Sequence, residues 1–509
     1  MAFIHLPQIF QDHMILQRDK PLHIWGSAKA CSHITVVLND CAQTATVENG
    51  QFSVTLPPQP AGRNCVLLLY ADYCASPDIV LSDISIGDVW MACGQSNMEY
   101  FLRYDAHWND TKKLPPNSDI RMYNCPRIAF EGQKRVQEEC GRWFSEGDPA
   151  WPLFSAPGYA FARDLQPRLQ VPVGIIGCNW GGTPACAWMD EETLKHPPLH
   201  IFLKEYLQAC ADVSPDFLYN YSMECWKYED SYRHQLEWRA VMYGLTSTEQ
   251  KLWLQEHKND PVLPMGPYHH YRPAGLYHTM IQKIAPFSVK GFLWYQGESD
   301  ADHAEIYDQT LSALISCFRR VWKDEELPFL FVQLAPFRKW LNCTGEGFEI
   351  VRQRQETVSK TVPKTGMISV MDLGDEYDIH PKFKMEVGRR LALLARGKVY
   401  GETLLCESPE FSAASLKDRQ IIFSFHHARG GLIGDIHSRD AFVITQGNQL
   451  LGIEACVLSG EQLILLLDHS PQDLPLHIAF AMQDYCPVHI WNKAGLPLKP
   501  FSCDLPSGA

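Results

Sequence analysis

The chain has 509 residues, 46% of them hydrophobic and 20% charged, a composition that is typical of a folded protein with about two to four domains. A formal net charge of −14 argues against nucleic-acid binding, because nucleic-acid surfaces need clustered lysine and arginine. No apolar run approaches the roughly 18 residues of a membrane-spanning helix, so we predict a soluble chain with no membrane partner.

The N-terminal sequence and the cysteines indicate a cellular compartment. Residues 1–7 lack the basic start and the continuous apolar stretch of a secretory signal. Seventeen cysteines, an odd number at irregular spacing, favour reduced thiols over a disulfide framework. We therefore expect a cytoplasmic protein.

Three regions follow one another along the chain. Residues 1–85 alternate in short β-like stretches with turn signals between them, which predicts an N-terminal β-domain. Residues 86–400 alternate continuous apolar runs with helical patterns, which is typical of an α/β domain whose parallel sheet is covered on both faces. Within it, residues 190–270 are aromatic and charged and predict a helical insertion. Residues 401–509 return to β-like stretches and predict a C-terminal β-domain.

The first motif lies at the end of an apolar run. Residues 89–93 are typical of a buried strand, which stops at Gly94 and is followed by Gln95 and Ser96. Glycine permits a tight turn, and open α/β sheets bind ligands at the carboxyl ends of their strands. Ser96 is therefore a candidate nucleophile, and the alternative is a serine that caps the next helix.

Three further apolar runs end in small and polar residues. These runs cover residues 173–179, 292–295 and 368–373, and they lead into residues 180–184, 296–300 and 375–381. The first supplies adjacent glycines whose backbone N–H groups a ligand can approach closely. The second supplies an amide and a carboxylate, and the third a histidine among acids. The four strand ends together carry the groups that acyl transfer needs.

At these residues the chain resembles the SGNH hydrolases, and among them the sialate O-acetylesterases. Its four blocks match, in order, Gly94-Gln95-Ser96-Asn97-Met98, Trp180-Gly181-Gly182-Thr183-Pro184, residues 294–299 and Ile379-His380-Pro381. The resemblance extends to residues 274–281 and 491–497 but does not cover residues 190–270. It implies an SGNH-type three-layer α/β/α catalytic domain and a serine esterase that removes acetyl groups from sugars, sialic acids above all.

The chemistry assigns a role to each block. An ester carbonyl needs an activated nucleophile and fixed donors for its developing oxyanion. Ser96 is the expected nucleophile, and His380 takes its proton and returns it to the departing sugar hydroxyl. The backbone N–H groups of Ser96 and Gly182 and the side-chain amide of Gln296 are the expected oxyanion hole. By resemblance, block three often places an asparagine where this chain has Gln296.

The acid that orients His380 stays open. Many SGNH hydrolases carry an aspartate three positions before the histidine, where this chain has Tyr377. Asp378 lies two positions before His380 and reaches the imidazole if the segment is extended. We rank Asp378 first, Asp375 second and Glu298 third. A dyad completed by a backbone carbonyl and a solvated acidic loop with a structural histidine are the remaining alternatives.

No other constellation competes with this one. The adjacent histidines at 269–270 and 426–427 would diverge on a strand, and no His-Glu-X-X-His, Cys-X-X-Cys or Gly-Lys-Ser run is present. We expect no metal and no cofactor. An acetylesterase of plant-polysaccharide fragments such as acetylated xylo-oligosaccharides, and a non-catalytic carbohydrate-binding protein, are the alternative functions. An anionic sugar would require local arginines that the sequence does not identify, and the oligomeric state stays open.

Overall fold

The computed structural model describes residues 3–72, 74–135, 137–471 and 475–506, which form two compact units. The first unit holds the described residues up to Ser299 together with Asp308–Leu330 and Lys382–Ala392. The second unit holds Asp300–Tyr307, Phe331–Pro381 and the described residues from Leu393 onward. Each unit is described by itself below.

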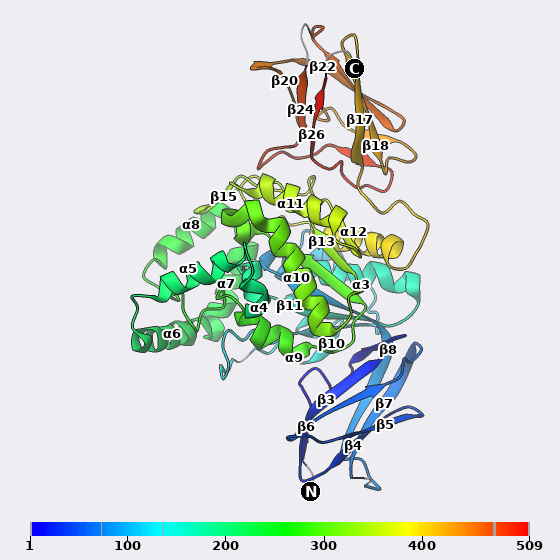
Figure 1. Ribbon diagram of the computed structural model, residues 1–509, viewed down its shortest axis with the longest axis vertical. Coiled ribbons are helices and arrows are strands. Elements are labelled where there is room, and N and C mark those ends of the chain that lie inside the picture. Colours follow the sequence, from blue (N-terminus) through cyan, green and yellow to red (C-terminus); the bar gives the residue numbers. More distant parts are fainter. Residues whose placement is uncertain (1–2, 73, 136, 472–474, 507–509) are drawn as a thin grey trace. The chain divides into compact units, whose positions relative to one another are not determined.

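The first unit begins with strands that pair mostly antiparallel, drawn in blue in Figure 1. One sheet has the order β1-β3-β6, and a second group of strands adjoins the long strand β8. Side chains alternate between buried and more exposed along β3, β4 and β6, so each of these strands has one buried face. The bounds are β1 Phe3–His5, β2 Ile15–Gln17, β3 Leu22–Lys29, β4 His33–Leu38, β5 Cys41–Thr46, β6 Gln51–Leu56 and β7 Gly62–Ala71.

Strand β8 (Ile79–Gly94) belongs to two environments. Its first residues alternate in exposure and pair antiparallel with β7, whereas every residue from Ile84 to Gly94 is buried. The buried part pairs in parallel with β11 (Val173–Asn179) and β12 (Gly291–Tyr295). The switch from alternating to continuous burial marks the passage from a one-sided sheet to a sheet that is covered on both faces. The predicted boundary between residues 85 and 86 falls within this strand.

The central sheet of the first unit has the strand order β10-β9-β11-β8-β12. Strand β9 (Ile120–Asn124) is parallel to β11, and the edge strand β10 (Trp143–Ser145) is antiparallel to β9. Helix α3 (Ala156–Leu169) packs on β9 and β11, and Phe318 of α10 (Tyr307–Trp322) lies 5.3 Å, centroid to centroid, from Phe292 of β12. Buried parallel strands with packed helices confirm the predicted α/β class.

Five α-helices lie in the predicted insertion, residues 190–270, between β11 and β12. They are α4 Glu191–Leu194, α5 His200–Cys210, α6 Pro215–Glu229, α7 Tyr232–Gly244 and α8 Ser247–Glu256, drawn in green in Figure 1. Helix α7 packs against α6 and α8. The N-terminus of α8 is fixed by a capping box between Thr246 and Glu249. Among the described residues, no helix combines the length and apolarity needed to cross a bilayer.

The second unit contains the C-terminal strands. Two four-stranded sheets have the orders β17-β18-β23-β22 and β21-β20-β24-β26, and they share a core of buried aliphatic and phenylalanine side chains. Their bounds are β17 Glu410–Lys417, β18 Gln420–His426, β20 Phe442–Gln446, β21 Gln449–Leu450, β22 Ile453–Ser459, β23 Gln462–Leu467, β24 Leu476–Phe480 and β26 Phe501–Leu505. A smaller pair joins β19 (Leu432–Gly434) to β25 (Ile490–Asn492).

The segment before the histidine motif departs from the expected strand. Strand β16 (Thr365–Ile368) receives a backbone hydrogen bond from Gln333, beyond the end of β13 (Phe329–Val332), at 2.9 Å. It ends at Ile368, so the expectation of a strand over residues 368–373 is wrong. A turn follows at Met371 and Asp372. Along the chain, the neighbouring elements are the two-residue strands β14 Lys339–Trp340 and β15 Cys343–Thr344 and the helices α11 Phe348–Thr361 and α12 Lys384–Lys398.

The cysteines follow the prediction from their number and spacing. All seventeen are free thiols, and many lie inside the protein, among them Cys93 and Cys178 on neighbouring positions of β8 and β11. Buried thiols of this kind act as small apolar side chains.

Candidate active site

Ser96 lies where the buried strand β8 ends. Gly94 has φ +135°, and a Cβ atom at this position would lie 2.2 Å from the carbonyl oxygen of Tyr295, so the turn requires glycine. Every residue from 84 to 102 is buried except Ser96, which is half-buried. The helix-cap interpretation of Ser96 is wrong, because Gln95 is the N-cap of the short helix α1 (Ser96–Glu99).

The first three motifs meet at this strand end. A Cβ atom built on Gly181 would lie 3.5 Å from the Cβ atom of Ser96, so the two backbones lie close together. The amide of Ser299 donates to Oε1 of Gln95 at 3.2 Å, and the Ser299 hydroxyl donates to the Gly182 carbonyl at 3.0 Å. The first unit therefore brings the segments around residues 96, 182 and 296 together.

The three expected oxyanion donors lie in this assembly. Within the part of the chain that the structure describes, the backbone amides of Ser96 and Gly182 donate to no protein acceptor. Gly182 has φ +75°, a conformation that glycine adopts without strain. Gln296 is fully buried, and its Nε2 atom donates to the carbonyl of Thr183 at 3.4 Å. That contact is longer than the 2.7–3.2 Å of a typical N–H···O bond.

Glu298 and Lys384 support the residue that follows Ser96. The Asn97 amide donates to Oε1 of Glu298, and the Lys384 ammonium group donates to Oδ1 of Asn97 at 2.6 Å. Lys384 is completely buried, and its Nζ atom lies 5.2 Å and 5.3 Å from the ring centroids of Tyr100 and Tyr295. These contacts give Glu298 a partner at the serine motif and indicate a supporting role.

His380 lies in the second unit, on a loop of bends. Its side chain is 2% exposed, and its ring makes a T-shaped contact with Trp340, with the centroids 5.2 Å apart. Oδ1 of Asp378 accepts the backbone N–H of His380 at 2.8 Å and lies 3.7 Å from the imidazole Nδ1. Asp375 accepts the backbone N–H groups of Tyr377 and Asp378 at 2.8 Å and 3.1 Å.

The two acids thus have different surroundings. Asp378 approaches His380 because the chain bends between them, and the extended segment that we expected is not formed. The observed hydrogen bonds of Asp375 instead stabilise the turn that precedes His380. Ser96 and His380 belong to different units, and their meeting stays a prediction, as do the roles assigned to all the candidate residues.

Contacts from the C-terminal strands hold the loop that carries His380. The indole Nε1 of Trp491 donates to Oδ2 of Asp372 at 2.8 Å, and the backbone amide of Val488 donates to the carbonyl of Met371 at 3.0 Å. Arg338 forms an ion pair with Glu376 at 2.8 Å. Trp491 therefore anchors the start of the histidine loop, a role that its position in the sequence did not indicate.

The sequence also did not predict several other contacts at the serine motif. Oε2 of Glu99 accepts the N–H of Gly181 at 2.6 Å. A Cβ atom on Gly182 would lie 1.9 Å from the Tyr271 hydroxyl oxygen, so this tyrosine lies directly against Gly182. His270 stacks on Trp180 with the centroids 4.6 Å apart. The aromatic run at residues 268–271 is the one local feature of the sequence that marks these residues. Their contacts with residues 180–182 could not be predicted, because residues so far apart in sequence share no spacing pattern.

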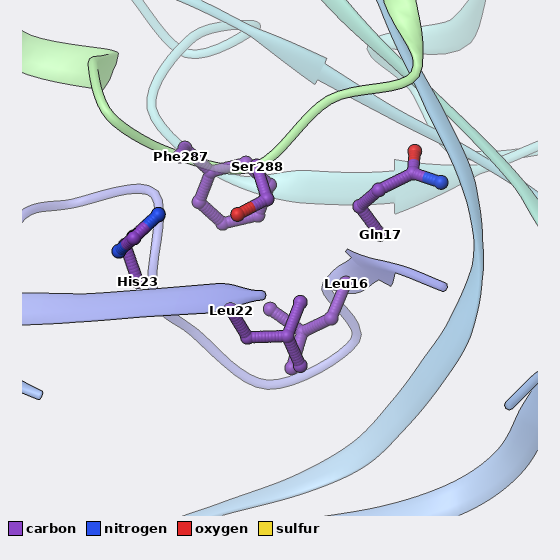
Figure 2. Close-up of a pocket in the computed structure, with 6 residues that line it drawn as sticks. All are labelled: Leu16, Gln17, Leu22, His23, Phe287 and Ser288. Atoms are coloured by element: carbon purple, nitrogen blue, oxygen red, sulfur yellow. The ribbon is translucent and has the colours of Figure 1, made fainter. Parts of the chain in front are cut away.

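A hollow shown in Figure 2 lies elsewhere in the first unit. It is lined by Leu16, Gln17, Leu22, His23, Phe287 and Ser288, none of them a candidate site residue, and its empty volume of about 150 Å³ includes space open to solvent. Ligand pockets for small molecules usually hold about 300 to 1,000 Å³. The hollow is therefore too small for a sugar. Among the described residues, no three histidine, cysteine or carboxylate side chains are arranged to hold a metal ion.

Comparison with known protein families identifies one domain in this chain. Residues 254–395 match the family of carbohydrate esterases described as sialic acid-specific acetylesterases. The matched region contains Gln296, Glu298, Asp375, Asp378 and His380 and ends outside the motifs of Ser96 and Gly182. It also includes the last part of the segment for which the sequence showed no resemblance.

Comparison with whole proteins also finds similarity to acetylesterases of sugars. The sialate O-acetylesterase of Rattus norvegicus is 26% identical over 484 residues, covering 87% of this chain and 81% of that protein. The sialate O-acetylesterase of Homo sapiens is 25% identical and covers 78% and 71%. The crystal structure of a carbohydrate acetylesterase from Xanthomonas citri matches with a TM-score of 0.74 at 26% identity, over 99% of this chain and 100% of that chain.

Proposed function

We propose that the chain is a carbohydrate O-acetylesterase of the sialate O-acetylesterase type, and that it is a serine esterase acting on O-acetylated sialic acids. The observation that carries the serine mechanism is the exposure of Ser96. It alone reaches solvent within the buried run 84–102, at the junction of three motifs that supply an amide, glycine N–H groups and a carboxylate.

The proposed reaction has two halves. The Ser96 hydroxyl attacks the acetyl carbonyl while His380 accepts its proton, which gives a tetrahedral oxyanion. Collapse of this intermediate breaks the ester bond, and His380 donates the proton to the departing sugar oxygen. Water then attacks the acetyl-serine with His380 as general base, and release of acetate restores the hydroxyl of Ser96. Atoms and protons balance without a cofactor.

The oxyanion is assigned to the amides of Ser96 and Gly182 and to the side chain of Gln296. The position of Gln296 supports this role, because its fully buried side chain carries an amide donor, Nε2, beside the second motif at Thr183. Asp378 is assigned to His380, with its carboxylate oxygen 3.7 Å from Nδ1. One hydrogen bond supports the pairing of Ser96 with His380. Lys384, which is only four positions after His380 in the sequence, donates to Asn97, the residue after Ser96.

The finer fold assignment is part of the same proposal. We assign residues 86–400 to an SGNH-type three-layer α/β/α catalytic domain, with β-domains at residues 1–85 and 401–509. The parallel order β9-β11-β8-β12 and the C-terminal sheets support it.

The test is acetate release from a substrate panel. The panel holds O-acetylated sialic acids and acetylated xylo-oligosaccharides, and the enzymes are the wild type, Ser96→Ala and Ser316→Ala, which removes an exposed serine of α10. We expect release from sialic acids by the wild type and by Ser316→Ala only. Equal rates on xylo-oligosaccharides would contradict the sialic acid assignment, and an active Ser96→Ala would contradict the serine mechanism.

A further inference from the structure

Glu99 contacts the glycine loop that is assigned to the oxyanion hole. Its Oε2 atom accepts the N–H of Gly181 at 2.6 Å, a short, charge-assisted hydrogen bond. A Cβ atom on Gly181 would lie 3.1 Å from the same oxygen and 3.5 Å from Cβ of Ser96. The carboxylate therefore holds the peptide that precedes Gly182 directly beside the nucleophile.

The charge of Glu99 is buried, and a buried network balances it. Arg127 donates through Nη1 to Oε1 of Glu99 at 2.9 Å and through Nη2 to Oε1 of Glu139 at 2.6 Å. Arg239 of α7 pairs with the same Glu139 oxygen at 2.8 Å. Burial would raise the pKa of Glu139, but the two arginines lower it to about 2. Glu139 is thus ionised at neutral pH, and the network links the inserted helices to the serine motif.

The pairing with Arg127 decides whether Glu99 helps or hinders the reaction. A bare carboxylate next to the glycine loop would repel a developing oxyanion, since like charges interact strongly where water is excluded. Arg127 compensates that charge while leaving Oε2 on Gly181. The Gly181 N–H is then committed to Glu99, and the next amide in the chain, that of Gly182, is the one left to face a ligand.

We propose that Glu99 is a positioning residue for the oxyanion hole: it fixes the Gly181 peptide so that the Gly182 N–H is directed at the oxyanion formed on Ser96. This inference rests on the proposed serine esterase function. Glu99 touches neither substrate nor reacting atoms in this scheme, and its effect passes through the loop.

Glu139 provides the matched control, because it is buried and bound to the same arginine but makes no observed contact with Gly181. We compare Glu99→Gln, Glu99→Asp and Glu139→Gln by 4-nitrophenyl acetate hydrolysis and thermal unfolding. Both Glu99 variants are expected to lower kcat about tenfold or more at a KM within about twofold, since oxyanion donors act in the transition state. Glu139→Gln is expected to lower the melting temperature while kcat stays within about threefold.

Inhibition by phenylboronic acid separates positioning from a structural effect. Boronic acids form a tetrahedral adduct with a serine hydroxyl, so the inhibition constant of the Glu99 variants should rise by the same factor by which kcat falls. Glu99→Asp keeps the charge and loses reach, and it tests the idea if Glu99→Gln fails to fold. Full kcat in Glu99→Asp, or equal kcat losses in Glu99→Gln and Glu139→Gln, would overturn the proposal. An active Ser96→Ala would instead overturn the proposed function itself.

Discussion

The serine motif and the histidine loop are positioned by different means. Ser96 follows a fully buried strand whose end is fixed by the backbone conformation of Gly94. His380 lies among bends, where Asp378 and Asp375 bind backbone N–H groups and Trp491 holds Asp372 from far along the chain. Regular secondary structure therefore positions Ser96, whereas side-chain hydrogen bonds determine the conformation of the loop that carries His380. We expect substitutions around the loop to act through these individual bonds.

The largest effect is expected from the imidazole itself. His380→Ala removes the proposed general base and should lower kcat/KM for 4-nitrophenyl acetate by about 10⁴-fold, the order found when a triad member is lost. His426→Ala, which removes an exposed histidine of β18, is the control and should be fully active. A His380→Ala enzyme within tenfold of the wild type would show that the two regions do not form one catalytic site.

On the serine side, the largest effect after the loss of Ser96 itself is expected at the buried amide of Gln296. Gln296→Ala removes one oxyanion donor and should lower kcat about a hundredfold with a small change in KM, because the contact strengthens only in the transition state. The buried position also predicts a loss of stability. Gln353→Ala, on the exposed face of α11, is the matched substitution and should change neither property. If kcat of Gln296→Ala is unchanged, the third donor must lie elsewhere.

The same contrast explains how far the sequence could predict the molecule. The apolar run before Gly94 and its serine follow from local pattern, so the strand end and the α/β class could be predicted. The contact of Glu99 with Gly181 joins residues 82 positions apart and leaves no periodic trace. The expected strand to residue 373 ends early, and there the carbonyl of Met371 and the carboxylate of Asp372 accept hydrogen bonds from Val488 and Trp491. Tertiary contacts decided the local structure there.

The acids of the histidine loop can be distinguished by paired substitutions. Asp378→Asn keeps an oxygen acceptor for the His380 backbone N–H but removes the charge that would stabilise the imidazolium, so we expect kcat to fall about a hundredfold. Asp375→Asn keeps the turn contacts and should leave kcat within about threefold. Full activity in both variants would favour a dyad completed by a backbone carbonyl, and a larger loss in Asp375→Asn would reverse our ranking.

The smallest effect is expected at the C-terminal anchor of the loop. Trp491→Phe keeps an aromatic ring and removes the N–H that donates to Asp372 at 2.8 Å. A hydrogen bond to a charged group contributes about 1.5 to 3 kcal/mol to the free energy of unfolding. Because Asp372 is partly solvated, we expect the free energy of unfolding to fall by an amount near the lower end of this range, and kcat to fall several-fold. A double-mutant cycle with Asp372→Asn, measured by urea unfolding, should give a coupling energy of about 1 kcal/mol. Additive losses would show that this bond does not hold the loop, and the histidine side would then be positioned, like the serine side, by its own backbone.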